Sequence, residues 1–231
     1  MTLTGKVILI TGANGGLGAA VTKAFLEAGA RVAGVAKKIQ NSDFPNANFI
    51  AHAAELGSAD AAGAVAASVI AKWEKIDALV HLVGAFTGGR SVAETDDGAL
   101  EQMLDANLRT SFHMFRAVLP GMRTRGAGRI LAIGSRTAID PQPMVGVYSA
   151  SKAALVSLVR TIALENKDRG ISANVILPGT MDTPINRAAM PGADPAKWVQ
   201  PAQGASLLVH LVTDQASQIS GAVIPIAGGE L

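Results

Sequence analysis

The chain of 231 residues contains no cysteine, few charged residues and few aromatic ones. Without cysteine, disulfides, thiolate nucleophiles and zinc–thiolate sites are excluded, and the chain suits a reducing compartment. Charged residues make up only 16% of the sequence and apolar residues 49%, a balance that excludes intrinsic disorder. Two tryptophans, six phenylalanines and a single tyrosine, Tyr148, are too few for an aromatic platform that stacks sugars or bases.

Charge and hydropathy also argue against nucleic-acid and membrane partners. The net charge of +2 is too small for a polyanion-binding surface, and no block of basic residues occurs. The longest runs without a charge, 7–22 and 198–213, have 16 residues each and contain polar residues, so neither predicts a membrane span. Residues 1–6 lack the basic start and apolar run of a signal peptide. We therefore expect a cytoplasmic protein without nucleic-acid or membrane partners.

Short β-branched runs alternate with longer alanine-rich segments, without an internal repeat or linker, which predicts one dinucleotide-binding domain over 1–231. The expected strands are 6–10, 31–36, 48–51, 78–83, 129–134, 172–177 and 222–226, and the expected helices are 17–28, 59–74, 97–122, 148–167 and 201–212. Repeated strand–helix–strand order predicts a three-layer, doubly wound Rossmann fold with about seven parallel strands. The interval 37–47 is too short and polar for a full crossover helix.

A glycine-rich loop follows the first expected strand directly and opens the first expected helix. It reads Gly12-Ala13-Asn14-Gly15-Gly16-Leu17-Gly18. Glycines let the backbone approach a pyrophosphate, whose charge is stabilised at the helix N-terminus, so Gly12, Asn14, Gly16, Leu17 and Gly18 are predicted to bind the cofactor. The alternative is a plain strand-to-helix turn.

The second expected strand ends in Ala36-Lys37-Lys38, without the acidic residue that binds the ribose of NAD. Two ammonium groups would attract a 2′-phosphate, so Lys37 and Lys38 favour NADP(H), with NAD(H) possible. The alternative is that both lysines are only solvated surface charges.

Tyr148 and Lys152 are four residues apart at the start of an expected helix, which places both on one face. A nearby cation stabilises phenolate and lowers the pKa of the phenol, which suits it to acid–base catalysis. Ser135, on the loop after the fifth strand, is predicted to meet the phenol at the same edge of the sheet and to hold a substrate carbonyl. Taken singly, each residue is equally compatible with packing or surface exposure.

These motifs resemble those of the short-chain dehydrogenase/reductase family over essentially the whole chain. The resemblance implies a catalytic tetrad of Asn107, Ser135, Tyr148 and Lys152, with Tyr148 as the acid–base and Lys152 on the nicotinamide ribose. It further implies cofactor contacts at Tyr148 and at five positions outside the glycine loop and the lysine pair: Glu55, Gly84, Pro178, Gly179 and Thr183. Hydride transfer between nicotinamide and a carbonyl or alcohol carbon is the implied reaction, in a homodimer or homotetramer.

The chain departs from this family in the motif after the fourth strand, where it reads His81-Leu82-Val83-Gly84 instead of Asn-Asn-Ala-Gly. We interpret His81 as a hydrogen-bonded histidine of the strand rather than an acid–base group. The other histidines lack metal-ligand spacing, so no metal site is predicted.

The shortened second crossover, the loop 83–89 and the segment 177–198 resemble those of dihydropteridine reductases, a divergent branch of the family. A dihydropteridine reductase-like enzyme is therefore one alternative function. A dinucleotide-binding regulatory protein without catalysis is the other, although the complete tetrad argues against it.

Five residues on loops after the fourth to sixth strands, together with Ser135, are predicted to contact substrate: Phe86, Met144, Ile185, Met190 and Trp198. Packing in the core is the alternative for each of them. A mostly apolar pocket suits a flat or hydrophobic carbonyl compound. The sequence thus predicts an NADP(H)-preferring alcohol dehydrogenase or carbonyl reductase.

Overall fold

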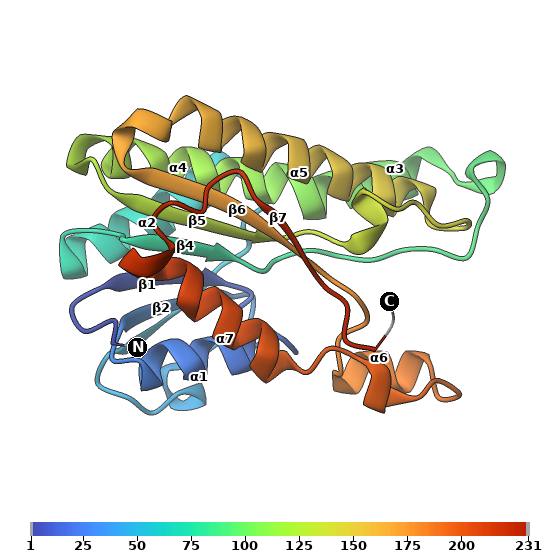
Figure 1. The fold of residues 1–231 in the computed structure, drawn as a ribbon, viewed down its shortest axis with the longest axis horizontal. Coiled ribbons are helices and arrows are strands. Elements are labelled where there is room, and N and C mark those ends of the chain that lie inside the picture. Colours follow the sequence, from blue (N-terminus) through green and yellow to red (C-terminus); the bar gives the residue numbers. More distant parts are fainter. Residues whose placement is uncertain (1, 230–231) are drawn as a thin grey trace.

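The computed structural model describes residues 2–229; residues 1, 230 and 231 of the expected 1–231 domain lie outside the described part. Its centre is one parallel sheet with the strand order β3-β2-β1-β4-β5-β6-β7 (Figure 1). The strands are β1 (Val7–Thr11), β2 (Arg31–Ala36), β3 (Phe49–Ala53), β4 (Ala78–His81), β5 (Gly128–Ile133), β6 (Ile171–Pro178) and β7 (Val223–Ile226). The expected seven-stranded, doubly wound sheet is confirmed.

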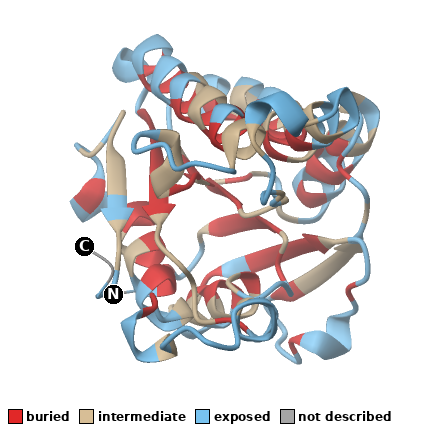
Figure 2. Cartoon of the chain, turned by 90° about the vertical axis from the view of Figure 1, so that its right-hand side faces the viewer, coloured by how far each residue is buried: buried red, intermediate tan, exposed pale blue. Residues whose placement is uncertain are grey.

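Helices cover both faces of this sheet. They are α1 (Gly18–Glu27), α2 (Ala59–Trp73), α3 (Asp97–Leu104), α4 (Thr110–Arg125), α5 (Gly146–Glu165), α6 (Pro184–Ala189) and α7 (Pro201–Val212). Helices α2, α4 and α5 pack on one face and α1 and α7 on the other, which gives three layers (Figure 1). Figure 2 shows the buried residues concentrated in the sheet and on the helix faces turned toward it.

The first strand shows why its sequence is apolar without alternation. Val7 and Leu9 pack into the core beneath α2, α4 and α5, while Ile8 and Ile10 pack into the core beneath α1 and α7. All four side chains are fully buried. A parallel strand with a helical layer on each side needs this pattern.

The connection from β2 to β3 contains no full helix, as expected from its length. A short 3-10 turn, Asn41–Asp43, takes its place. Phe44 and Phe49 lie against each other there, with ring centroids 4.9 Å apart, and both are buried in the core on the α1 side. Two aromatic side chains thus fill the space that a crossover helix would cover.

Two segments differ from the expected elements. The predicted helix 97–122 is α3 and α4 joined by a π-helical turn, Asp105–Arg109. Helix α6 was not predicted, although Thr183 caps its N-terminus and Pro184 occupies its first turn, both of which are helix-start signals.

Helix α5 is the one described helix that is long and apolar enough to cross a membrane. Its buried side contributes Leu155, Val159 and Ile162 to the core against the sheet. The apolar character of α5 therefore serves packing inside this fold.

Candidate active site

The site lies at the carboxyl edge of the sheet, where β1 and β4 are neighbours and the strand order reverses. Ligands of doubly wound sheets bind at such a reversal. The glycine loop leads from β1 into α1 here, and Gly12 adopts a φ of +70°, which favours glycine. A methyl group at Gly18 would collide with the carbonyl oxygen of Gly12, so the turn into α1 needs glycine there as well.

The N-terminus of α1 is open to an anion. Its N-cap residue, Leu17, makes no side-chain hydrogen bond to the first turn, and the N–H of Ala19 donates to the carbonyl oxygen of Gly15 at 2.9 Å. Asn14, in the same loop, donates from Nδ2 to the carbonyl oxygen of Lys38 at 2.6 Å and ties the loop to the end of β2. The backbone at this point therefore fits the pyrophosphate of a dinucleotide.

The loop after β6 reaches the same place. A methyl group at Gly16 would lie 2.7 Å from Thr183 Cγ2, so these residues are in direct contact. Pro178 ends β6, and the N–H of Gly179 donates to the carbonyl oxygen of Ile226 at 2.8 Å. The structure thus brings together the two loops that the sequence assigns to the cofactor, and the contact between them is that of Gly16 with Thr183.

At the carboxyl ends of β2 and β3 lies a cavity of about 650 Å³, lined by Lys37, Glu55 and Gly84 among others. Lys37 Nζ forms an ion pair of 3.2 Å with Glu55 Oε1, and both side chains are largely exposed. The lysine expected to attract a 2′-phosphate is therefore already paired with a carboxylate expected beside the adenine. Gln102, Asp105 and Arg109 also line the cavity, and the sequence analysis missed them because they project from α3 and the π turn.

Tyr148 and Lys152 lie one turn apart in the first turns of α5, as predicted. Lys152 is only 4% exposed, and its Nζ donates to the carbonyl oxygen of Ile133 at 2.9 Å. Burial lowers the pKa of Lys152 to about 8. At neutral pH the ammonium form therefore still predominates.

The pKa of the Tyr148 phenol differs from the expectation. Burial raises its pKa, and a hydrogen bond with Ser135 opposes this effect. These are the two effects on this pKa, and the expected lowering by Lys152 is not among them. Ser135 is held by Thr137, whose N–H donates to Ser135 Oγ at 3.3 Å.

Asn107 is fully buried in the π turn between α3 and α4. Its Oδ1 accepts from the N–H of Ala85 at 2.9 Å, and its Nδ2 donates to the Ala85 carbonyl at 3.0 Å. The same Nδ2 donates to Ser151 Oγ at 3.0 Å. A methyl group at Gly84 would lie 2.7 Å from Asn107 Oδ1 and 3.0 Å from Lys152 Nζ, so the amide and the ammonium approach one point.

The structure thus brings the four residues of the predicted tetrad together from three segments of the chain: the π turn, the loop after β5 and the start of α5. Ser135 contacts Tyr148, and Asn107 meets Lys152 across Gly84. Ser151, which the sequence analysis missed, links Asn107 to the start of α5 by donating to the Tyr148 carbonyl at 2.7 Å. The spacing within the Tyr148–Lys152 motif contained this serine but gave no sign of its partner.

His81 lies inside the sheet, only 1% exposed. Its Nδ1 is 2.9 Å from the hydroxyl of Thr11 on the neighbouring strand. Burial, and to a lesser extent the charge of Lys152, lower the pKa of His81 to about 3, so the ring is neutral at physiological pH. The interpretation of His81 as a hydrogen-bonded strand residue is confirmed. Within residues 2–229 no group of side chains suited to a metal ion occurs.

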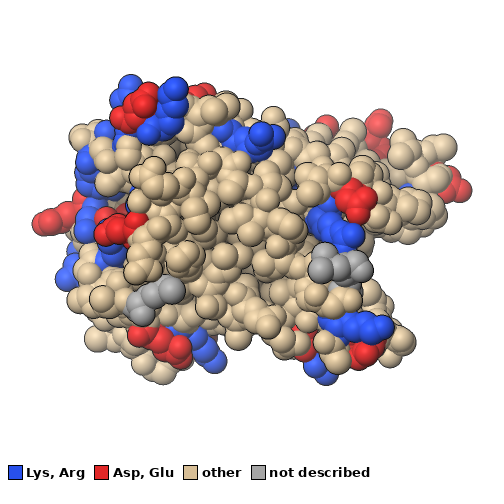
Figure 3. All heavy atoms as spheres, in the orientation of Figure 1, with Lys and Arg blue, Asp and Glu red and all other residues tan. Residues whose placement is uncertain are grey.

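Of the five apolar residues predicted to contact substrate, four are exposed and one is buried. Phe86, Met144, Ile185 and Met190 are all exposed, whereas Trp198 is only 4% exposed. Trp198 therefore packs inside the protein, as in the alternative given for it, and its contact with substrate stays a prediction. Figure 3 shows the surface hollowed on its right-hand side, between the segment that carries α6 and the loops before α3 and α5. We call this hollow the cleft.

The segment around α6 is held by an ion-paired network that the sequence did not suggest. Arg187 donates from Nε and Nη2 to the two carboxylate oxygens of Asp182, at 2.6 and 2.8 Å. Gln200 donates to the same carboxylate at 3.1 Å. These bonds connect α6 to Asp182 and Gln200, which follow Met181 and Val199 in the chain. Met181 and Val199 themselves pair as an isolated parallel β-bridge.

Comparison with known proteins identifies relatives over nearly the whole chain. A family model described as "short chain dehydrogenase" matches residues 6–193. The chain is 28% identical over 247 residues to 2,3-dihydro-2,3-dihydroxybenzoate dehydrogenase of Escherichia coli (strain K12), covering 99% of this chain and 98% of the relative. It is also 28% identical over 241 residues to a 3-oxoacyl-(acyl-carrier-protein) reductase of Salmonella typhimurium, with coverage of 99% and 98%.

Solved structures show the same fold. The chain superposes with a TM-score of 0.92 on the 3-ketoacyl-(acyl-carrier-protein) reductase from Brucella melitensis complexed with NADH, at 26% identity and with 99% of each chain covered. The structure of ElxO with NADP bound superposes with a TM-score of 0.91 at 21% identity, which supports the fold alone.

Proposed function

The chain belongs to the short chain dehydrogenase family, and on that premise we propose that it is an NADP(H)-preferring oxidoreductase that interconverts a carbonyl and an alcohol. The observation that carries this proposal is the contact of Tyr148 with Ser135, one helical turn from the buried ammonium of Lys152. The glycine loop is connected to this reaction centre, because Gly12 lies against Leu82 and Val83, and the next residue, Gly84, lies against Lys152.

A bound nicotinamide dinucleotide supplies or accepts the hydride. Tyr148 exchanges a proton with the substrate oxygen, and Ser135, held by Thr137, positions that oxygen with its hydroxyl. Lys152 binds the nicotinamide ribose with its ammonium group, one helical turn from Tyr148. Asn107 fixes Ala85, and with it Gly84, next to Lys152.

Binding of the dinucleotide is assigned to three sets of residues, one for each part of the cofactor. Gly12, Asn14, Gly16, Leu17 and Gly18 take the pyrophosphate at the start of α1. Pro178, Gly179 and Thr183 take the nicotinamide end, since Thr183 lies against Gly16. Lys37, Lys38, Glu55 and Gly84 take the adenosine end, because three of these residues line the cavity there.

Preference for NADP(H) rests on the lysines at the end of β2. Lys37 and Lys38 are exposed where an NAD enzyme has an acid, and an ammonium attracts a 2′-phosphate. The relative complexed with NADH shows that the fold also accepts the other cofactor. Initial rates with NADPH and NADH at equal concentration test this preference, and faster turnover with NADH would contradict it.

The activity itself is tested with Tyr148→Phe. We expect turnover to fall by about a hundredfold or more, since general acid–base catalysis contributes about 10²–10⁴-fold. Binding of NADPH, measured by titration calorimetry, should remain near that of the parent, which shows that the variant is folded. Unchanged turnover would refute the role of Tyr148, and no other phenol in the chain can replace it.

The substrate panel for these assays should contain ketones, oxoacyl thioesters and quinonoid dihydropterin. The short connection that contains Asn41–Asp43 is a reason to include the pterin, because it is one of the three features in which the sequence resembles dihydropteridine reductases. Turnover confined to the pterin would replace the carbonyl assignment with that of a dihydropteridine reductase-like enzyme. A cofactor that binds but is never oxidised or reduced would indicate a regulatory protein. A cytoplasmic homodimer or homotetramer is the expected form.

A further inference from the structure

Phe86 lies directly beside the acid–base residue. Its ring centroid is 4.9 Å from that of Tyr148, and the two planes meet at 75°, an edge-to-face arrangement. Tyr148 is partly buried, whereas Phe86 is 67% exposed. One side of the Phe86 ring therefore covers the phenol, and much of the rest of the side chain remains open to solvent.

The position of this ring is fixed by two loops that are joined to each other. A methyl group at Gly88 would lie 3.0 Å from Phe86 Cζ and 2.9 Å from Val145 Cγ1, so Phe86 and Val145 both press on the backbone of Gly88. The N–H of Gly89 donates to the carbonyl oxygen of Met144 at 2.8 Å. Met144 has a φ of +67°, a strained conformation that persists only where its surroundings hold it.

Exposed apolar residues gather around the same cleft. Three segments border this cleft: 82–96 before α3, 134–145 before α5, and 179–200, which carries α6. Of the nine large hydrophobic side chains exposed in the described part of the chain, six lie on these segments: Phe86, Val92, Ile139, Met144, Ile185 and Met190. Such concentration on a surface marks a binding site.

The arginines on these three segments are engaged with carboxylates. Arg90 pairs with Asp96 at 3.0 Å, and Arg136 with Asp140 at 3.4 Å. Arg187 pairs with Asp182, as described above. Lys197 is the remaining cation of these segments. An anionic substrate would have to displace a paired carboxylate to reach an arginine, which favours an uncharged substrate.

We propose that Phe86 is the specificity-determining residue of this site and that the substrate is an uncharged carbonyl compound with an aromatic substituent. The substituent lies against the exposed side of the Phe86 ring, which places the carbonyl carbon next to Tyr148. This proposal rests on the oxidoreductase function proposed above.

The test compares Phe86→Ala with the parent on three ketones: an aryl methyl ketone, 2-butanone and the same aryl ketone carrying a carboxylate. The parent should prefer the uncharged aryl ketone by kcat/KM. Phe86→Ala should lose about tenfold in kcat/KM for that ketone, as expected for one aromatic contact and its buried area, and less than about twofold for 2-butanone. Circular dichroism and NADPH binding confirm that the variant is folded.

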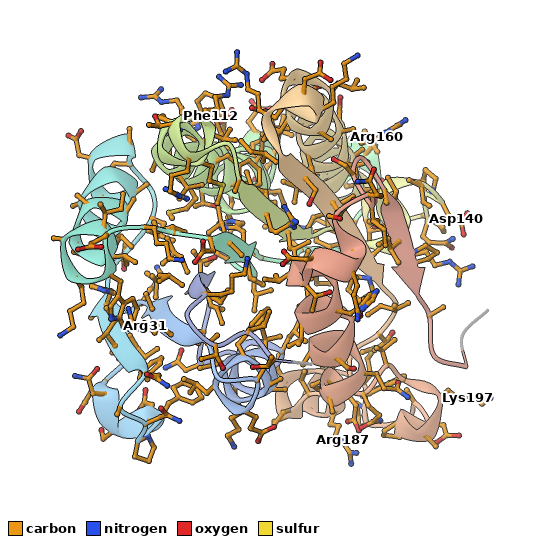
Figure 4. All side chains as sticks on the ribbon, turned by 60° about the vertical axis from the view of Figure 1, so that its left-hand side comes forward. Arg31, Phe112, Asp140, Arg160, Arg187 and Lys197 are labelled. Atoms are coloured by element: carbon orange, nitrogen blue, oxygen red, sulfur yellow. The ribbon has the colours of Figure 1, made fainter. Side chains whose placement is uncertain are left out.

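Phe112→Ala is the matched control, because Phe112 is also an exposed phenylalanine, 41% accessible, but lies on α4. Figure 4 shows Phe112 on the opposite side of the molecule from Asp140 and Lys197, which belong to the segments around the cleft. This variant should match the parent on all three ketones.

Equal loss for the aryl ketone and 2-butanone in Phe86→Ala would overturn the proposal, and so would preference of the parent for the carboxylated ketone. Both results would leave the oxidoreductase function intact, since turnover would still be seen. If the parent reduces none of the three ketones but turns over an oxoacyl thioester or the pterin, this inference fails and the oxidoreductase function stands. If it turns over no member of the panel with either cofactor while it still binds NADPH, both fail.

Discussion

The amide of Asn107 donates to the hydroxyl of Ser151 at 3.0 Å, and this hydroxyl in turn donates to the carbonyl oxygen of Tyr148 at 2.7 Å. Ser151 is fully buried, so water cannot replace either bond. The two hydrogen bonds connect the π turn to the first turns of α5. It therefore fixes the segment that holds the backbone of Ala85 relative to the helix that carries the acid–base residue.

Ser151→Ala should destabilise the protein by about 1–2 kcal/mol, because the hydroxyl is lost from a buried network. Turnover should fall about three- to tenfold, since Asn107 loses one of the bonds that orient its amide. Urea unfolding and steady-state kinetics measure the two effects. Ser151→Thr, which keeps the hydroxyl, should recover part of the turnover.

Ser149→Ala is the matched control for this prediction. Ser149 lies two residues before Ser151 and is also buried, but its hydroxyl has no hydrogen-bond partner among the described residues. Removing an unsatisfied hydroxyl should leave stability within about 0.5 kcal/mol of the parent or raise it. Equal losses of stability and turnover in the two variants would show that the hydrogen bonds of Ser151 contribute no more than the unpaired hydroxyl of Ser149.

Glu55→Gln should improve the use of NADPH relative to NADH. The carboxylate of Glu55 pairs with Lys37 at 3.2 Å, and it would also repel a 2′-phosphate brought to that lysine. Because exposed ion pairs contribute about 0.2–1 kcal/mol, we expect KM for NADPH to fall about two- to fivefold while KM for NADH stays nearly constant. Lys37→Met should change the preference in the opposite direction. A parallel change in KM for both cofactors would contradict the prediction.

The sequence predicted those parts of the fold that depend on local patterns. Buried strands such as Val7–Thr11 and the glycine loop that leads into α1 follow from hydropathy and glycine spacing. The shortened crossover was also predictable, because its length and polar residues exclude a helix. The tetrad was located by its resemblance to a family, and the structure adds the contacts that connect its members.

What the sequence did not predict depends on neighbours distant in the chain. The π turn at Asn107 accompanies two hydrogen bonds to Ala85, 22 residues away. The pairing of Lys37 with Glu55 follows from the register of β2 and β3, which sets Ala36 opposite Ala53. Trp198 was predicted to contact substrate because it lies on the segment after the sixth strand, and the tertiary structure buries its side chain there.

The stability of the protein should fall as the pH drops from about 6.5 toward 3, in part because of His81. Burial holds the pKa of His81 at about 3 in the folded chain, against 6.5 for an exposed histidine. In this window the unfolded chain binds a proton that the folded chain does not, so acidification favours unfolding.

His81→Asn should flatten this part of the pH–stability curve while keeping a polar group near Thr11. Urea unfolding of the parent and the variant at several pH values from 7 to 4 provides the comparison. His52, whose pKa burial also lowers, and the carboxylates contribute equally to both proteins. Identical slopes in parent and variant would show that His81 is not the group that resists protonation.

Gly16→Ala should damage the contact between the glycine loop and the loop after β6. The new methyl group would lie 2.7 Å from Cγ2 and 2.9 Å from Cβ of Thr183, and Thr183 cannot move freely because its hydroxyl caps α6. We expect a loss of about 1–3 kcal/mol in unfolding free energy, as for other overpacked sites, and weaker NADPH binding. Gly15→Ala is the control, since its methyl group would meet only the Gly12 carbonyl oxygen, at 3.3 Å. Neither glycine has a positive φ, so both tolerate alanine in their backbone conformation, and the difference between the two variants isolates the contact with Thr183. Thermal melts and titration calorimetry measure both quantities, and equal behaviour of the two variants would exclude a role for that contact.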